Sequence, residues 1–386
     1  MGRPKKESVS ITKASPHTIK KFELIEYYVD AWARKILGYN GANGREGSKG
    51  LIYIDCMSNS GLYHDNNGDL VDGTALRIVK ALNNLIENYP TKKAIVLFND
   101  IDHSKIELLK AQISTIALKD NIEIYFSEED CNVFLHNLNV SDFTQQYQTL
   151  LLYDPYIASL DWSAIDPFLN RWGEVIINHM ISDTKRGITL AKKEDVKGRY
   201  QTTYDETNIA RIIDMAKDKK QLNDAVIKII QKRSNKAVYI ASFSFFNQNN
   251  SLVYDLIHCC SNLEGFKLIK KSAWKTFGDK SSLKDTHGTQ NQLRINLDGT
   301  GCIETETDDE CYYVSDIAKD IIHKFGNRDN VTLGEIYRYL DIHPIFPSDG
   351  YKDVIKNELR DLGVKLPRST NGTITFPNRK EAQWIQ

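Results

Sequence analysis

The sequence predicts an α/β protein built around an open, doubly wound parallel sheet. Five short runs are apolar throughout, as in strands that are buried on both faces, and segments with helical periodicity separate them. Alternation of this kind is typical of parallel sheets with helices on both faces. At 386 residues the chain exceeds one ordinary core, so we expect two domains, the sheet domain covering residues 21–290.

The strands and helices of the predicted sheet alternate regularly. An amphipathic helix, Ile19–Leu37, comes before them. The predicted strands are Gly50–Asp55, Lys93–Asp100, Ile122–Phe126, Thr149–Tyr153 and Glu174–Met180. The helices between them are Thr74–Leu85, Ser104–Ala117, Cys131–Leu138 and Ser163–Trp172.

The segment 185–236 interrupts this pattern. It is highly charged and has helical periodicity, which predicts a helical insertion. Two apolar runs follow, Ala237–Phe246 and Leu252–Cys259, and we expect them to form a hairpin at the sheet edge. A final antiparallel hairpin is typical of the sheet of S-adenosylmethionine (SAM) methyltransferases. The predicted fold is therefore Rossmann-like and of the methyltransferase type.

The end of the chain predicts a second, smaller domain. Residues 291–312 are interpreted as a linker with a short β segment ending near Glu306, and residues 313–386 as a winged helix. Its predicted helices are Val314–Phe325, Thr332–Leu340 and Asp349–Leu362, followed by a hairpin of Val364–Arg368 and Thr373–Pro377 with an Asn-Gly turn. Thr332 and Glu335 have the spacing of a capping box.

Basic residues predict two places of contact with nucleic acid, although the net charge of −1 gives no global field. Residues 1–20 are interpreted as a flexible basic arm, in which Arg3, Lys5 and Lys6 surround Pro4 as in an AT-hook that enters a minor groove. A solvated tail is the alternative. Lys352, Lys356 and Arg360 are the candidates on the third helix of the winged helix, where acids alternate with them. Docking of a protein is the alternative there.

Several classes of protein are excluded by composition. The longest apolar runs are too short for a membrane span, and no apolar segment follows the basic N-terminus as it would in a secretory signal. The six cysteines lack CxxC spacing and nearby paired histidines, so no metal centre of the zinc-finger kind is expected. We expect a cytoplasmic protein with reduced thiols.

Acidic residues follow four successive strands and predict a binding site. Asp55, Asp100, Asp130 and Asp154 each come at or just after the end of a predicted strand, where open parallel sheets bind ligands. SAM needs such acceptors for its ribose diol, adenine amine and ammonium. A dinucleotide or nucleoside triphosphate would need glycine-rich loops, and the fingerprints GxGxxG and GxxxxGK[ST] are absent. Helix capping is the alternative role of each acid.

The turn Asp154-Pro155-Tyr156 is the candidate catalytic motif. Amino-methyltransferases have an Asp/Asn-Pro-Pro-aromatic turn after the fourth strand. The acid there accepts a hydrogen bond from the exocyclic amine that receives the methyl group, and the aromatic ring stacks on an extruded base. One proline of that motif is missing here. An ordinary turn with a packed tyrosine is the alternative.

The segments around these acids resemble the three-Cys-motif partner (TcmP) family. Residues 53–63 and 72–75 are similar to its pattern YIDxFAGPGxY … DGSP, and residues 98–102, 152–156 and 265–275 are similar to its later motifs in the same order. The resemblance extends from about Phe22 to Phe277. It implies a methyltransferase-like fold, a winged-helix C-terminus, and a partner that is a radical-SAM-like protein with a three-cysteine motif.

The same resemblance implies roles for individual residues. Asp55, Ser58, Asn59 and Gly61 would form the cofactor loop, Asp100 would hold the ribose, Asp130 would lie near the adenine, and Asp154, Pro155 and Tyr156 would form the catalytic turn. Asn59 stands where the family has glycine, so its side chain lies where the methionine part of SAM would be. Three hypotheses follow: a methyltransferase acting on nucleic acid, a degenerate partner subunit that binds nucleic acid or substrate, and a winged-helix regulator.

Overall fold

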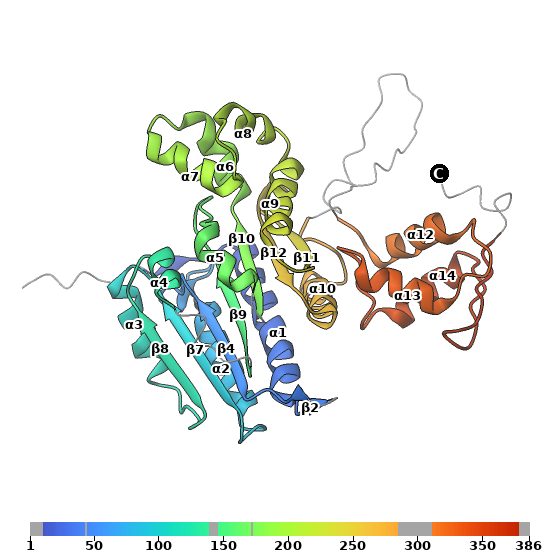
Figure 1. Cartoon of the computed structure of the whole chain (residues 1–386), viewed down its shortest axis with the longest axis horizontal. Coiled ribbons are helices and arrows are strands. Elements are labelled where there is room, and N and C mark those ends of the chain that lie inside the picture. Colours follow the sequence, from blue (N-terminus) through green and yellow to red (C-terminus); the bar gives the residue numbers. More distant parts are fainter. Residues whose placement is uncertain (1–10, 43–44, 139–145, 171–172, 285–310, 378–386) are drawn as a thin grey trace, which may run out of the picture.

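A seven-stranded sheet forms the centre of the computed structural model, which describes residues 11–42, 45–138, 146–170, 173–284 and 311–377 (Figure 1). Its order is β11-β12-β10-β9-β4-β7-β8. The strands are β4 (Gly50–Asp55), β7 (Lys93–Asn99), β8 (Ile122–Ser127), β9 (Tyr147–Tyr153), β10 (Gly173–His179), β11 (Tyr239–Phe246) and β12 (Leu252–Cys260).

The topology of this sheet is that of a methyltransferase. Numbered one to seven along the chain, the strands lie in the order 6-7-5-4-1-2-3. The first five are parallel, whereas β12 runs antiparallel to both β10 and β11. The predicted fold class is therefore confirmed. The chain changes direction across the sheet on either side of β4, and ligands of open α/β sheets bind at the carboxyl ends of strands at such a point.

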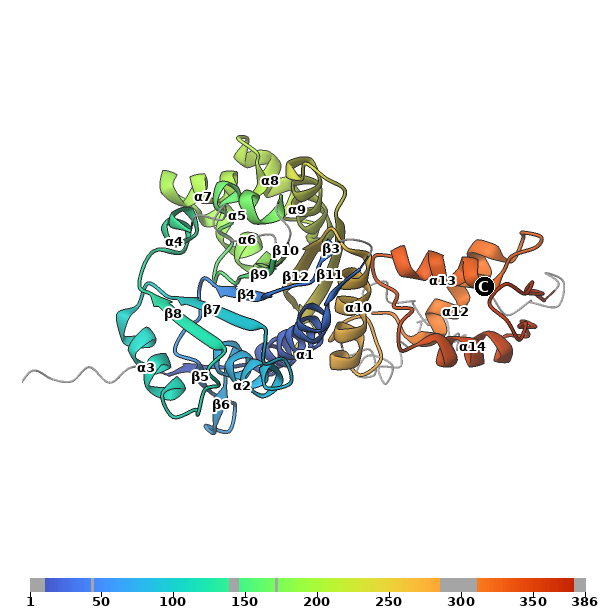
Figure 2. The ribbon, with the colours of Figure 1, turned by 60° about the horizontal axis from the view of Figure 1, so that its bottom comes forward.

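Helices cover both faces of the sheet and bury two separate apolar cores (Figure 2). One face packs against α1 (Pro16–Gly38), α2 (Thr74–Ile86), α3 (His103–Ile113) and α10 (Leu263–Phe277). The other packs against α4 (Cys131–Asn137), α5 (Trp162–Leu169) and the helices between β10 and β11, which are α6 (Ile181–Gly187), η2 (Ile188–Leu190), α7 (Glu194–Tyr204), α8 (Ile209–Met215) and α9 (Lys219–Arg233). No described helix is both long enough and apolar enough to cross a membrane.

The prediction that residues 1–20 form a flexible arm is wrong for residues 11–20. β1 (Thr12–Lys13) pairs with β5 (Leu62–His64), which in turn pairs with β6 (Leu70–Asp72). Helix α1 already begins at Pro16, because Ser15 caps it and proline suits a first helical position. Arg3, Lys5 and Lys6 lie outside the described residues. A small hairpin of β2 (Gly41–Ala42) and β3 (Arg45–Glu46) follows α1.

Helix α10 is an element that the sequence analysis did not predict. Its apolar residues Phe266, Ile269, Ala273 and Phe277 recur at helical spacing and are all buried. The helix begins at a capping Asn262 and ends at Gly278, whose φ of 79° is left-handed. It lies between the sheet and the C-terminal helices.

Three C-terminal helices enclose a third core. They are α12 (Val314–Phe325), α13 (Leu333–Ile342) and α14 (Lys352–Asp361), in the predicted order, although α14 begins three residues after the predicted Asp349. The predicted capping box of Thr332 and Glu335 is present. The predicted hairpin is limited to one antiparallel bridge, Lys365↔Thr375, and a second bridge, Thr332↔Thr373, joins its second arm to the residue that caps α13. The predicted β segment before this domain lies outside the described residues.

Candidate functional site

Three of the predicted acids come together where β4, β7 and β9 end. Asp55 is the last residue of β4, Asp100 follows β7, and Asp154 follows β9. Asp55 and Asp100 are almost fully buried, with 2% and 5% of their surface exposed. Because carboxylates are seldom buried without partners, the contacts of each acid indicate what this site can hold.

Asp154 is held by two side chains. The Nζ atom of Lys21 lies 2.6 and 2.8 Å from its two carboxylate oxygens, and Asn178 Nδ2 donates to Oδ1 at 2.6 Å. Lys21 comes from α1, 133 residues away in sequence, and its side chain is 9% exposed. It also lies 5.3 Å from the centre of the Tyr254 ring. Sequence reasoning missed Lys21, and the available signal was a lysine on the apolar face of an amphipathic helix.

Asp55 has an unusual protonation equilibrium. Burial, and next the negative charge of Asp154, raise the pKa of its carboxyl group to about 8, against a hydrogen bond from the Met57 backbone that lowers it. The side chain is therefore mostly protonated at neutral pH. A protonated Asp55 can donate a hydrogen bond, which a carboxylate cannot.

The loop after β4 makes a tight turn. Asn59 and Gly61 both have left-handed backbone conformations, with φ of 55° and 74°. A Cβ atom on Gly61 would lie 2.6 Å from Leu109, so glycine is required there for space as well. The Ser58 backbone donates to Asn99 O at 2.8 Å, which joins this loop to the end of β7.

Asn59 connects the loop after β4 with Asp100 and with the turn after β9. Its backbone N–H donates to Asp100 Oδ2 at 3.0 Å, and its side-chain amide donates to the hydroxyl of Tyr156. Asp102 N donates to Asp100 Oδ1 at 3.0 Å, and Lys105 Nζ is 3.9 Å from Oδ2. Tyr156 is 54% exposed, and Lys105 Nζ lies 5.4 Å from the centre of its ring.

Asp130 is not brought into this cluster. It is exposed and caps α4, with Oδ1 accepting from the backbones of Asn132 at 2.9 Å and Val133 at 3.3 Å. This is the capping role that was the alternative for each acid. Asn99, which sequence reasoning missed, connects its loop to the site: its side chain donates to Cys56 O and Glu129 O at 3.1 and 3.0 Å.

His179 and the described cysteines have structural roles. His179 is fully buried, and its Nε2 atom lies 2.9 Å from the Tyr204 hydroxyl, so it is a packed core histidine. Burial lowers its pKa to about 3, which keeps it neutral. All five described cysteines are buried free thiols.

The basic residues of α14 line a groove in the C-terminal domain. Lys352, Lys356 and Arg360 are four residues apart and lie on one side of the helix. The groove has a volume of about 420 Å³ and is also lined by Tyr337, Arg368 and the apolar side chains of Leu333, Leu366 and Pro367. Lys352 and Lys356 also pair with Asp349 and Asp353 at 3.7 and 3.0 Å.

Comparisons with known proteins give structural similarity alone. No family model matches the chain, and no curated protein matches it. Among solved structures, protein LPL1258 from Legionella pneumophila is 12% identical, with 66% of this chain and 92% of that chain covered and a TM-score of 0.37.

Two further solved structures carry methyltransferase names. A putative rRNA methylase from Clostridium thermocellum is 10% identical, covering 60% of this chain and 94% of that one, with a TM-score of 0.29. The O-methyltransferase TomG from Streptomyces achromogenes, solved with SAM, is 8% identical, covering 65% and 92%, with a TM-score of 0.33. The methyltransferase-type fold of this chain rests on its strand order.

Proposed function

We propose that this chain is a SAM-dependent methyltransferase that acts on an amino group of nucleic acid. The observation that carries the proposal is the convergence of Asp55, Asp100 and Asp154 at the switch point of a methyltransferase-type sheet, beside the left-handed turn at Asn59 and Gly61. Fold alone does not define an activity, so the proposal depends on the chemistry of these side chains.

The side chains around the turn fit SAM in part. Asp100 uses one acceptor position on each oxygen for a backbone N–H, and a carboxylate offers about four, so its oxygens can still accept from a ribose diol. Asp55 and the carbonyls of the loop would face the ammonium group. SAM would supply a methyl group on a positively charged sulfur. The Asn59 side chain, bonded to Tyr156, must turn away to admit it.

Asp154 and Tyr156 would hold the acceptor. Asp154 can accept a hydrogen bond from an exocyclic amine, while Asn178 keeps its carboxylate in place. Lys21 contacts both oxygens of Asp154, so it would have to move away or keep only one of them when the amine of the substrate binds. The exposed ring of Tyr156 offers a surface on which an extruded base can stack.

The C-terminal domain would hold the polymer. Its order of three helices and antiparallel bridges supports the interpretation as a winged helix. The basic groove along α14 supports contact with phosphates. A regulator that only binds DNA through this domain would have the same groove, and measuring methyl transfer distinguishes the two functions.

A second candidate is a binding subunit without catalysis, for which the occupied site is the specific observation. Lys21 already neutralises Asp154, and the contact between Asn59 and Tyr156 closes the loop over the turn. Such a subunit would serve the radical-SAM-like three-Cys-motif protein that the family resemblance implies. Co-expression of both proteins should then yield a stable complex, and their separation on co-purification would count against this role.

Calorimetry with SAM and S-adenosylhomocysteine tests the first proposal. We expect binding to the wild-type chain, tighter binding to Asn59→Gly because the obstructing side chain is gone, and at least tenfold weaker binding to Asp100→Asn. Asp218→Asn is the matched control, because this exposed acid caps α9, one of the helices between β10 and β11, and is not a candidate residue of the site. No heat of binding to wild type or to Asn59→Gly at millimolar ligand would refute cofactor binding and favour the binding subunit.

A further inference from the structure

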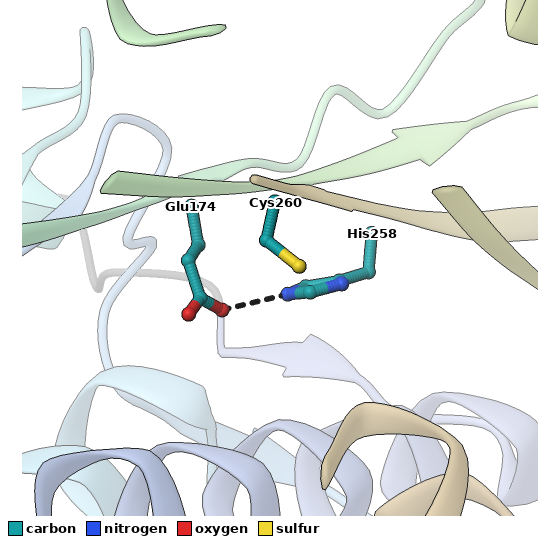
Figure 3. Close-up of side chains that lie close together, drawn as sticks. All are labelled: Glu174, His258 and Cys260. Carbon is teal, nitrogen blue, oxygen red and sulfur yellow. Dashed lines mark hydrogen bonds and ion pairs between the residues drawn. The ribbon is translucent and has the colours of Figure 1, made fainter. Parts of the chain in front are cut away.

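A buried polar cluster lies on a face of the sheet that packs against helices (Figure 3). It consists of Glu174 from β10 with His258 and Cys260 from β12. In the antiparallel register Glu174 is directly opposite Cys260, and His258 is opposite Ile176, so all three side chains leave the same face of the sheet. None of the three is more than 3% exposed. The ligand atoms of the three residues lie within 4.8 Å of one another.

Tyr28 of α1 completes the cluster from the helical layer. Its hydroxyl donates to Glu174 Oε2 and lies 2.9 Å from His258 Nε2. The cluster therefore presents a carboxylate, an imidazole, a thiol and a phenol to one point between the sheet and α1. The carboxylate, the imidazole and the thiol are donor types that zinc binds in proteins.

Hydrogen bonds do not satisfy every polar atom of the cluster. The only ion pair that Glu174 makes among the described residues is with His258, at 2.8 Å. His258 Nδ1 is buried without a hydrogen-bond partner, and the Cys260 thiol donates only to Asn262 O at 3.1 Å. A buried carboxylate is costly unless it is neutralised. A divalent cation with one carboxylate and one thiolate gives a neutral centre, which suits an apolar core.

We infer that Glu174, His258 and Cys260, with Tyr28 as the fourth donor, form a closed structural site for a zinc-type divalent cation. Bonds of about 2.0–2.3 Å place tetrahedral donors about 3.3–3.8 Å apart. The carboxylate and imidazole must therefore separate by roughly half an ångström from their present 2.8 Å to admit the ion. With four protein donors the site has no open position for substrate, so its role is structural.

The surroundings of Glu174 restrict where its carboxylate can go. A Cβ atom on Gly265, in the first turn of α10, would lie 2.6 Å from Glu174 Oε1. Glycine thus lets the helix approach the carboxylate closely. The ion would join β10, β12 and α1. Because Lys21 lies seven residues before Tyr28 on α1, the same anchor would fix the lysine that holds Asp154.

Metal analysis of the purified full-length protein is the direct test. We expect about one zinc ion per chain after expression with zinc and extensive dialysis, and none in Cys260→Ala or His258→Gln. Cys259→Ala is the matched control, because this neighbouring cysteine is equally buried but belongs to the core on the other face of the sheet. Circular dichroism of each variant establishes that it is folded.

Cobalt substitution provides a readout that does not depend on the stability of a variant. Refolding the wild-type chain with cobalt should give a thiolate-to-cobalt charge-transfer band that Cys259→Ala retains and Cys260→Ala loses. A wild-type protein that folds without metal, binds none on refolding and melts at the same temperature with zinc or with a chelator would overturn the inference. The cluster would then be a hydrogen-bonded network only.

Discussion

Asp55 shows how burial can turn an acid into a pH-sensitive residue. Its neighbours Asp154 and Lys21 act in opposite directions on its pKa, but burial dominates and raises the value to about 8 from an ordinary 3.8. Between these two values the folded state binds a proton that the unfolded state has released. The free energy of unfolding contributed by Asp55 therefore falls as pH rises from about 4 to about 8, and the loss is complete above pH 8.

Asp55→Asn should remove this dependence, because an amide does not ionise in this range. We expect the variant to lose less stability than wild type between pH 5 and pH 9, with a difference of at most about 1.4 kcal/mol per pH unit in that interval. Urea unfolding at the two pH values measures it. Asp130→Asn is the control and should follow wild type. Parallel pH curves for Asp55→Asn and wild type would show that Asp55 is ionised throughout.

Helix α10 connects the sheet domain with the C-terminal helices. The Nζ atom of its fully buried Lys270 donates to the carbonyl oxygens of Leu340, Asp341, His343 and Phe346 at 2.7, 3.0, 2.8 and 3.1 Å. Trp274 Nε1 donates to Ile345 O at 3.0 Å. These carbonyls lie at the end of α13 and just beyond it, where a helix leaves its last carbonyls without internal partners and favours a cation.

Lys270→Met should keep the packing of the aliphatic part of the side chain and leave these carbonyls without a hydrogen-bond donor. We expect a loss of roughly 2–4 kcal/mol in the free energy of unfolding, as buried acceptors lose their partners. Hydrogen exchange should accelerate in α13 and the residues after it. Lys275→Met is the control, because its side chain is 43% exposed and, among the described residues, forms an ion pair with Asp279 alone. Equal exchange in both variants would contradict the role of Lys270.

The elements that the sequence predicted well are those with strong periodicity. All seven strands and the three C-terminal helices follow one another along the chain as predicted. The strands were predictable because runs such as residues 94–98 are apolar on both faces. Helix α10 has an equally clear apolar spacing, although it was not among the predicted helices. The start of α1 at Pro16 also had a local signal, the capping Ser15.

Contacts between distant segments explain what the sequence could not predict in the site. The strand ends predicted that Asp55, Asp100, Asp130 and Asp154 would meet, since parallel strands share an edge, and all but Asp130 do. Nothing local to Lys21 indicates that it would reach Asp154. The cluster of Glu174, His258 and Cys260 depends likewise on the register of β10 with β12, which spacing along the chain does not show.

At the scale of the whole molecule, the candidate site and the basic groove belong to separate cores. The C-terminal helices lie beyond α10, at the opposite end of the molecule from β8 and α3 (Figure 1). A polymer held at α14 therefore has to be long to reach Tyr156 as well. Nucleic acid satisfies this requirement, and its affinity would then depend on salt through the phosphates that Lys352, Lys356 and Arg360 neutralise.

Replacing these three residues with glutamine should weaken binding and reduce its salt dependence. Each lost phosphate contact lowers the slope of log K against log salt by about 0.7–0.9, so we expect a slope smaller by about 2–3. Titrations of labelled single- and double-stranded oligonucleotides at several salt concentrations measure it. The matched control replaces three exposed lysines between β10 and β11, Lys217, Lys220 and Lys228, which removes the same charge. An equal change in both triple variants would mean that net charge acts instead of the groove, and unchanged binding in both would exclude α14 as the nucleic-acid contact.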